Sequence, residues 1–337
     1  MNRLLVFSIL LGGNLPAADH LLKITPETVA WGYYWSAAKP VLTVKSGDTV
    51  TVECVSVGNP TTLEGAGLPA DQVEADIRRL YAEVPKDSKG PGGHPLTGPI
   101  AIEGAMPGDV LEVRIKEIRL RSAYAFNSFG PGRGFLPDDF TTRKTRIIAL
   151  DREKMIGHFA PGIDVPLRPF FGSMGVAPPE AAGKISSAPP GIHAGNMDNK
   201  ELVAGTTLFI PVHAAGALFE VGDGHAGQGN GEVDITAMET SLTGVFQFIV
   251  HKDMHLKWPR AETPTHYITM GIDADLTEAT KICVRETLDF LVSEKKMTRE
   301  DAYQLASIAV DFDITQLVDG TKGVHGMIPK SIFVGMK

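Results

Sequence analysis

The sequence is poor in cysteine, in aromatic residues and in positive charge. Only two cysteines occur in 337 residues, aromatic side chains make up 7% of the chain, and the formal net charge is −8. Two cysteines form neither a disulfide framework nor a cysteine-based metal cluster. An acidic chain without runs of lysine or arginine also lacks the electrostatic footprint of a nucleic-acid-binding protein. The sequence therefore excludes a disulfide-stapled fold and gives no support to a nucleic-acid partner.

The N-terminal apolar run is too short to span a membrane, which takes roughly 20 apolar residues. This run, LLVFSILLGG, follows Arg3 and precedes the small residues Ala17 and Ala18. That order is typical of a secretory signal. We therefore predict a signal peptide over residues 1–18, a periplasmic or secreted protein, and no membrane association of the mature form. The alternative is a buried N-terminal strand or helix in a cytoplasmic protein.

The two cysteines lie in different kinds of segment. Cys54 belongs to the alternating run DTVTVECVSV, and Cys283 belongs to a segment with helical periodicity. We predict two buried thiols that behave as small apolar side chains. A single bridge between them in an oxidising compartment is the alternative.

Apolar residues are abundant, at 43%, and their spacing predicts strands over most of the chain. Residues 41–57 alternate about the turn Ser46-Gly47-Asp48, which predicts a hairpin. Residues 69–84 have helical spacing, and a long alternating strand ends at Leu120. Residues 123–143 have a loop composition and predict either a surface loop held down by aromatic side chains or a lid.

The last quarter of the chain has a helical pattern. Strand-like segments continue from 207 to 251, and they include the stretch EVDITAME. Asp275 and Thr298 then stand at N-cap positions before two amphipathic segments. We predict one α+β domain over 19–337. Its β-rich body of sandwich-like or barrel-like sheets extends to about residue 270, and an α/β C-terminal region follows over 271–337.

Two glycine-rich stretches gather polar side chains that suit a metal site. Asp223 and His225 are two residues apart, so an extended backbone points both to one side. Imidazole and carboxylate groups bind Zn²⁺ or a similar divalent ion, and glycine permits the tight turns that such a loop needs. The candidate ligands are His193, Asp198, Asp223 and His225, and the turn AGQGNG could bring the carboxylate of Glu232 beside them. The remaining histidines of the second half are read as strand-end or surface residues: His213, His251, His255, His266 and His325.

Several long blocks of the sequence resemble one known family. The blocks are HPLTGPIAIEGAMPGDVLEV, GSMGVAPPE, PPGIHAGNMDNKEL, GTTLFIPVHAAGALFEVGDGHAGQGNGEV and the C-terminal segment from GIDADLTEAT to KSIF. Together they are similar to the acetamidase/formamidase family of small-amide hydrolases, over roughly residues 24–334. The resemblance implies hydrolysis of formamide- or acetamide-like substrates and self-association into a homo-oligomer.

Amide hydrolysis needs an activated water, a stabilised oxyanion and a proton for the leaving nitrogen, and a divalent ion supplies the first two. The resemblance and the spacing together suggest His193, Asp198, Asp223 and His225 as ligands of a divalent ion, with zinc preferred and calcium or another ion as alternatives. Glu232 or Glu103 is the candidate general base. His94 and Asn196 are candidates for substrate binding.

Other mechanisms and one other function class have weaker support. Neither cysteine has a surrounding pattern that would create a reactive thiolate. Lys184, Ser186 and Ser187 lack the glycine- and serine-rich surroundings of a serine–lysine amidase. A non-catalytic periplasmic protein that binds a small molecule on the same fold is the alternative function. Release of ammonia from small amides separates the two functions.

Overall fold

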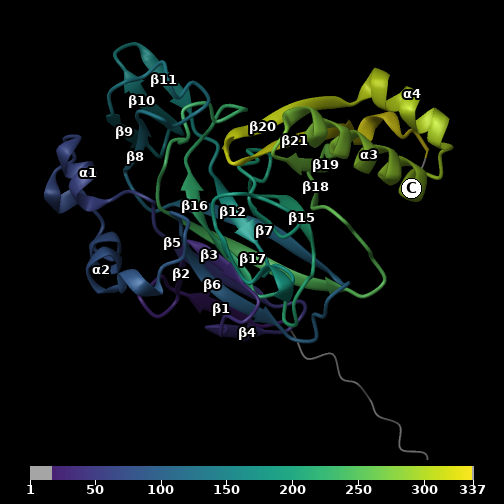
Figure 1. Ribbon diagram of the computed structural model, residues 1–337, viewed down its shortest axis with the longest axis horizontal. Helices are drawn as coiled ribbons and strands as arrows, with labels where there is room; N and C mark the ends of the chain where they lie inside the picture. The colour runs from purple at the N-terminus through teal and green to yellow at the C-terminus, as the bar shows by residue number, and fades with distance from the viewer. Residues whose placement is uncertain (1–16, 336–337) are drawn as a thin grey trace, which may run out of the picture.

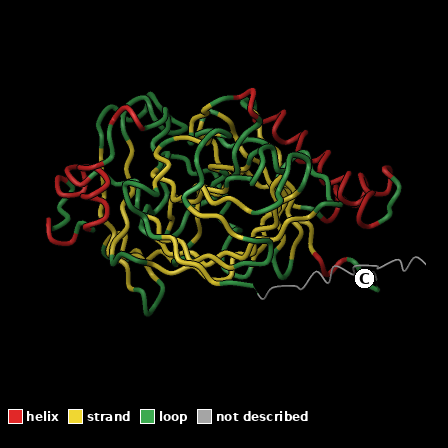
Figure 2. Tube along the Cα trace, turned by 90° about the horizontal axis from the view of Figure 1, so that it is seen from below, coloured by secondary structure: helices red, strands yellow, loops and turns green. Residues whose placement is uncertain are grey.

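The computed structural model describes residues 17–335, in which a β-rich body lies between helices at its two ends (Figures 1 and 2). The predicted signal peptide falls almost entirely on residues 1–16, which lie outside the described residues. Within the described part, no helix has the length and apolar character needed to cross a membrane.

The largest sheet has nine strands and runs through the whole body into the C-terminal region. Its strands in spatial order are β1 (Asp19–Leu22), β5 (Thr49–Cys54), β17 (Leu242–His251), β7 (Val110–Leu120), β15 (Thr206–Pro211), β18 (Arg260–Glu262), β19 (His266–Asp273), β21 (Thr321–Pro329) and β20 (Asp311–Asp319). All neighbouring pairs are antiparallel except β1 with β5. The C-terminal strands therefore extend the sheet of the body and form no separate sheet.

A second sheet of six strands carries most of the functional loops. Its strands are β14 (Ala194–Asn196), β12 (Phe170–Gly175), β16 (Phe219–His225), β6 (Pro95–Ile102) and β2 (Val29–Trp31), with β4 (Leu42–Val44) paired in parallel to β6. Two smaller sheets complete the body. They contain β11 (Ile163–Pro166), β10 (Ile156–Ala160), β9 (Lys144–Asp151) and β8 (Tyr124–Phe129), and β13 (Lys184–Ser186) with β3 (Tyr33–Trp35).

The two large sheets pack face to face through a shared apolar core. Phe246 and Phe248 of β17 reach Phe171 and Phe219 of the second sheet, with ring centroids 5.5 Å apart for Phe171 with Phe246 and 5.1 Å for Phe219 with Phe248. All four rings are fully buried. Aromatic pairs at this spacing add to the free energy gained by burying their surface. The body is therefore a sandwich, as the sequence predicts.

Helices occupy the ends of this sandwich. They are α1 (Pro60–Gly65), α2 (Ala75–Glu83), α3 (Leu276–Lys295) and α4 (Arg299–Ala309), with 3₁₀ turns at Ala70–Gln72, Lys86–Ser88, Glu180–Ala182 and Lys330–Ile332. The side chains of Asp275 and Thr298 accept the N-cap hydrogen bonds of α3 and α4. The predicted α+β class is confirmed, and α3, α4, β20 and β21 all follow residue 270.

Three local predictions were wrong. Residues 41–57 form two strands, but β4 pairs with β6 and β5 pairs with β1 and β17, so they are split between the two layers. Residues 124–129 are the strand β8, and only 130–143 form a loop. The stretch EVDITAME makes only isolated bridges at Glu239. Alternation reported burial correctly in β5, whose pairing nevertheless depended on strands distant in the sequence.

Both cysteines are buried and free. Burial raises the pKa of each thiol to about 12. The prediction of two inert buried thiols is confirmed, and the alternative of a bridge is wrong.

Candidate functional site

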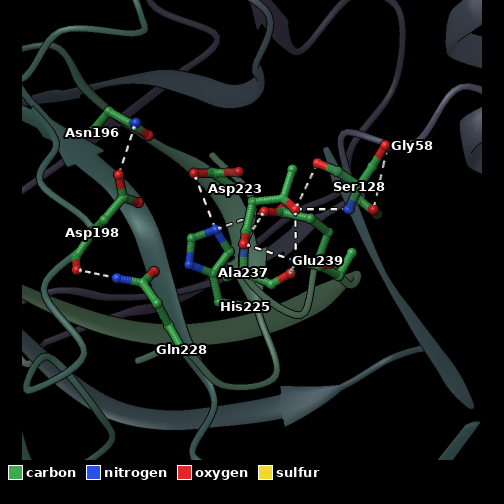
Figure 3. A network of polar contacts seen from close by, with 12 residues as sticks. Gly58, Ser128, Asn196, Asp198, Asp223, His225, Gln228, Ala237 and Glu239 are labelled. Carbon is green, nitrogen blue, oxygen red and sulfur yellow. Dashed lines mark hydrogen bonds and ion pairs between the residues drawn. The ribbon is translucent and has the colours of Figure 1, made fainter. Parts of the chain in front are cut away.

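Polar side chains from distant parts of the chain converge at the end of β16. Asp223 and His225 come from β16 itself, and Asp198 follows the short strand β14. Glu232 and Glu239 belong to the segment between β16 and β17. Figure 3 shows Asp223, His225 and Glu239 facing one another, with Asp198 beside them. Asp319, at the end of β20, completes the cluster.

The backbone at three of these residues is left-handed. The φ angles are +49° at Asp198, +57° at Asp223 and +45° at Glu232. A non-glycine residue in this region of φ/ψ space costs free energy, and such residues concentrate at functional sites. The unusual backbone redirects the three carboxylates, because a regular strand would alternate its side chains between the two faces. The structure therefore accepts local strain in order to bring these groups together.

A glycine of β12 provides the space in which the cluster sits. A Cβ atom at Gly172 would lie 2.5 Å from Oδ2 of Asp223, 2.8 Å from Cε1 of His225 and closer still to Oδ1 of Asp198. The backbone oxygen of Gly172 also accepts a hydrogen bond of 3.1 Å from the Asp198 N–H. The candidate ligands thus converge over a bare backbone, which only glycine provides.

Three overlapping groups in this cluster have the geometry of a metal site. In each group the ligand atoms lie within 4.8 Å of one another. The groups are Asp198, Asp223 and His225; His225, Glu232 and Glu239; and Asp198, Glu232 and Asp319. Nε2 of His225 lies 3.4 Å from both Asp223 Oδ2 and Glu239 Oε1. Asp198, His225 and Glu232 each belong to two of the groups, so the three groups form one connected cluster.

Several polar atoms of the cluster are buried and have no hydrogen-bond partner among the described residues. They are Asp198 Oδ1, both ring nitrogens of His225, Glu239 Oε2, Asp319 Oδ2 and Asn196 Oδ1. The other atoms are held in place: Asn196 Nδ2 donates to Asp198 Oδ2 at 3.1 Å, and Gln228 Nε2 donates to the Asp198 backbone oxygen at 2.9 Å (Figure 3). Buried polar atoms without partners are costly, so their convergence points to a ligand.

The charges of the cluster also indicate that it binds a positively charged ligand. Burial, together with repulsion from Glu232, Asp319 and Asp223, raises the pKa of Asp198 well above its usual value. Burial and neighbouring carboxylates likewise raise the pKa of Glu232, and the pKa of Asp319 rises to about 6. Burial by itself lowers the pKa of His225, but the negative charges of Glu239 and Asp223 outweigh this effect and raise it. Five acidic side chains share a single imidazole, so the site is short of positive charge.

A divalent cation fits this set of groups. Carboxylate oxygens with one imidazole nitrogen suit Zn²⁺ and, with more oxygen atoms, harder ions such as Ca²⁺. A cation would also supply partners for the orphaned oxygens and relieve the mutual repulsion of the carboxylates.

A cavity of about 250 Å³ opens onto the cluster. Asp223, Glu232, Glu239 and Asp319 form its polar floor together with Asn196. His94 lines it at the N-terminal end of β6 and is held by a contact of 2.9 Å between its Nδ1 and Ser187 Oγ. The cavity therefore gives small molecules access to Asp223 and to three further carboxylates of the cluster.

Two of the predicted site residues lie outside the cluster. His193 is buried against Tyr34, with ring centroids 5.0 Å apart, and belongs to none of the three groups. Glu103 is exposed and follows the C-terminal end of β6, at the opposite end of that strand from His94. At about 3.3 Å per residue, the length of β6 separates Glu103 from the cavity. The structure thus unites Asp198, Asp223, His225 and Glu232, but not His193 or Glu103.

Sequence reasoning missed Glu239 and Asp319. Glu239 lies in a stretch that was read as a strand, although its Oε1 accepts a hydrogen bond from the nearby Ala237 N–H at 2.9 Å. Asp319 precedes Gly320 in the turn between β20 and β21. An Asp-Gly pair is an ordinary hairpin turn signal. Nothing in the local sequence indicates that this turn reaches a cluster formed about ninety residues earlier. His325 was read as a strand-end or surface residue, but it is fully buried.

Comparison with known sequences gives a match along almost the whole described chain. A model of the Acetamidase/Formamidase family matches residues 29–184 and 179–334. The formamidase of Methylophilus methylotrophus is 26% identical over 256 residues, which cover 59% of this chain and 58% of that protein.

Solved structures are similar over a larger share of the chain. The predicted acetamidase/formamidase of Thermoanaerobacter tengcongensis has a TM-score of 0.80 at 28% identity, covering 94% of this chain and 97% of the other. The acetamidase of Yersinia enterocolitica has the same TM-score at 27% identity, covering 96% and 95%. The protein therefore has the same fold as these two proteins.

Proposed function

The chain belongs to the acetamidase/formamidase family and is an amide hydrolase, and from this premise we propose that it cleaves the C–N bond of small linear amides with a metal-activated water. Formamide- and acetamide-type substrates would yield a carboxylate and ammonia. One observation carries the metal-dependent part of the proposal: a cavity of about 250 Å³ ends on a buried cluster of carboxylates around a single histidine.

Asp198, Asp223 and His225 are the residues that we propose to hold the cation. They converge over Gly172, and their ligand atoms lie within 4.8 Å of one another. When bound, a divalent ion lowers the pKa of a water molecule and polarises the amide carbonyl. Zinc is our candidate and calcium the alternative. The hydrogen bond from Asn196 to Asp198 Oδ2 orients that carboxylate, as neighbours of metal ligands commonly do.

Glu232 is the proposed general base. Its carboxylate lines the cavity, and its pKa is raised by burial and by the charges of Asp319, Glu239 and Asp223. A carboxylate with a raised pKa can accept a proton from water and return it to the leaving nitrogen. His94 and Asn196 line the same cavity and are proposed to contact the substrate. Glu103, which is exposed, receives no role in this proposal.

A pair of variants tests these roles. Asp198→Asn should lower both the metal content and the activity, because an amide oxygen is a poorer ligand than a carboxylate. Glu232→Gln should retain the metal and lose about two to four orders of magnitude in kcat, the usual contribution of general acid–base catalysis. Metal analysis of the purified variants, together with ammonia release from formamide, acetamide and propionamide, provides the measurement.

The outcomes separate the alternatives. Loss of metal in Glu232→Gln would make Glu232 a ligand, and a loss of turnover in Glu103→Gln alone would make Glu103 the base. Wild-type protein that binds these amides in calorimetry but releases no ammonia would be a binding protein. Activity that survives EDTA in a metal-free sample would refute the metal-dependent mechanism.

The compartment and the assembly are separate proposals. We propose export guided by residues 1–18, which mass spectrometry of the mature N-terminus would test, and self-association, which light scattering would test. A mature chain that retains Met1 would refute the first proposal, and a monomer would refute the second.

A further inference from the structure

The outer wall of the cavity carries two arginines that have no partner. Arg133 and Arg143 both line the cavity, and both belong to the loop between β8 and β9. Within residues 17–335, neither guanidinium makes an ion pair or a side-chain hydrogen bond, and both residues are exposed. Arginine prefers planar acceptors such as carboxylates, which it binds with two parallel hydrogen bonds. These two groups are thus available to an anion that enters the cavity.

Both arginines arise from one small region of the loop. The Arg133 backbone N–H donates to the Gly130 oxygen at 3.2 Å, and a Cβ atom at Gly130 would lie 3.5 Å from Nε of Arg143. The pairing of β8 with β9 ends at Phe129 opposite Lys144, which closes the base of the loop. The two positive charges therefore stand on the same side of the cavity, on a loop whose base is closed by paired strands.

The cavity is larger than a formamide or acetamide molecule requires. These amides have three and four non-hydrogen atoms, and a water molecule occupies about 30 Å³ of the liquid. Even at one water volume per atom, acetamide would fill about half of the 250 Å³. The remaining wall includes the apolar side chains of Val57, Leu63 and Phe126. Such a wall suits a short hydrocarbon chain between the acidic floor and the arginines.

We propose that the preferred substrate is a primary amide with a carboxylate at the far end of a short carbon chain, the monoamide of a short dicarboxylic acid. Arg133 and Arg143 bind that carboxylate. This inference rests on the proposed amide hydrolysis. The water oxygen bonds to the amide carbon, the C–N bond breaks, and the nitrogen gains a proton and leaves as ammonia. The distal carboxylate is unchanged, so the product is a dicarboxylate.

The charge of the protein makes the two arginines necessary for such a substrate. The chain has a formal net charge of −8, and the floor of the cavity is formed by carboxylates. An anionic substrate would be repelled unless positive charge faced it along its route. Arg133 and Arg143 supply that charge at the outer wall. A neutral amide has no such requirement, so the arginines distinguish the two kinds of substrate.

Steady-state kinetics with two substrates of the same shape tests the proposal. Succinamate carries the distal carboxylate, and succinamide replaces it by a neutral amide. Wild-type protein should have a kcat/KM for succinamate at least about 10-fold above that for succinamide. Arg133→Gln and Arg143→Gln should each raise KM for succinamate about 10- to 100-fold with little change in kcat, the pattern of a lost charge-assisted hydrogen bond used in binding.

A matched variant controls for the change in net charge. Arg152 is exposed in the turn after β9, at the opposite end of this strand from Arg143, so Arg152→Gln removes the same charge from a remote position. It should leave the ratio between the two substrates unchanged. Calorimetry with succinate provides a readout besides activity: affinity should fall in Arg133→Gln and Arg143→Gln, and Arg143→Lys should restore part of it.

The outcomes distinguish this inference from the proposed function. Hydrolysis of succinamide and acetamide without a preference for succinamate would overturn the inference and leave amide hydrolysis intact. Equal losses for both substrates in the arginine variants would mean that the arginines act on the acidic floor, which also overturns it. Absence of ammonia release from every amide would refute the proposed function itself.

Discussion

At the scale of single residues, the site depends on unusual backbone conformations. Asp198, Asp223 and Glu232 all have positive φ angles. This backbone conformation is unfavourable for any residue other than glycine, because the Cβ atom is crowded by the backbone. The surrounding structure holds them: the Asp198 N–H donates to Gly172, and Gln228 donates to the Asp198 carbonyl oxygen. Strained residues persist only where neighbouring contacts fix them. The same residues carry the carboxylates, so strain and function coincide.

Substitution of Gly172 by alanine tests whether the open backbone is required. The new Cβ atom would lie 2.5 Å from Asp223 Oδ2 and closer to Asp198 Oδ1, so both carboxylates must move. We expect loss of the metal and at least a 100-fold fall in kcat/KM, since displacement of reacting groups by about 1 Å can cost about 100-fold. Metal analysis and amide hydrolysis provide the measurements.

The control is Gly65→Ala, because no atom lies within 4 Å of a Cβ at Gly65. This variant should retain both metal and activity. Full metal occupancy in Gly172→Ala would contradict the assigned ligand geometry.

At the scale of elements, the hairpin of β20 and β21 links the C-terminal region to the site. Gly231 and Gln316 form a parallel bridge, which joins β20 to the segment that carries Glu232. Asp319, at the tip of the hairpin, lines the cavity. The fully buried Gln316 shapes this tip: its Oε1 accepts from the Val318 N–H at 2.8 Å and the Asp319 N–H at 3.2 Å. The terminal hairpin therefore contributes to the candidate site as well as to the fold.

Variants of Gln316 test this link. Gln316→Met leaves the Val318 and Asp319 N–H groups without their acceptor, which should cost about 1–3 kcal/mol of stability and displace Asp319. Gln316→Glu keeps the acceptor but loses the hydrogen bond donated to the Thr321 oxygen. We expect activity to fall in the order wild type, Gln316→Glu, Gln316→Met, measured by kcat/KM for acetamide alongside thermal unfolding. Wild-type kcat/KM in Gln316→Met would show that the position of Asp319 does not matter.

At the scale of the whole molecule, an acidic chain keeps its densest group of carboxylates inside. Burial and mutual repulsion raise the pKa of Asp198 and Glu232, and the pKa of Asp319 is raised from 3.8 to about 6. Without a cation, the folded protein therefore binds protons that the unfolded chain releases. These protons stabilise the folded state at a pH below the pKa that the carboxyl groups have in the unfolded chain. This stabilisation is lost as the pH rises through the higher pKa that the same groups have in the folded protein.

Chelation should thus destabilise the protein more at neutral than at acid pH. Tm of the chelated protein should fall relative to that of the zinc-loaded protein as the pH rises from about 5 to about 7.5, because protons can no longer substitute for the cation. Differential scanning calorimetry of both forms at each pH measures this. The buried His193 and His325, whose pKa values burial lowers to about 4, titrate in both forms and drop out of the difference. A difference in Tm that does not grow with pH would contradict the assignment.

Local patterns in the sequence predict most of the secondary structure and four of the six residues of the cluster. The alternation of apolar and polar residues predicts most of the strands, and the N-cap residues Asp275 and Thr298 predict α3 and α4. These predictions succeed because each signal lies within the element that it predicts. Asp198, Asp223, His225 and Glu232 stood out because two glycine-rich loops carry them.

Which strands pair and which residues share the site depend on contacts between distant parts of the chain. Neighbours in sequence were separated when β4 and β5 joined different sheets, and the hairpin tip brought Asp319 beside Asp198 and Glu232. His193, although close to Asp198 in sequence, turned towards Tyr34. The physical reason is that both the pairing of strands and the meeting of the site residues are long-range contacts. They form when the two sheets bury a common apolar core, and the residues next to a strand in the sequence do not indicate which distant strand it will pair with.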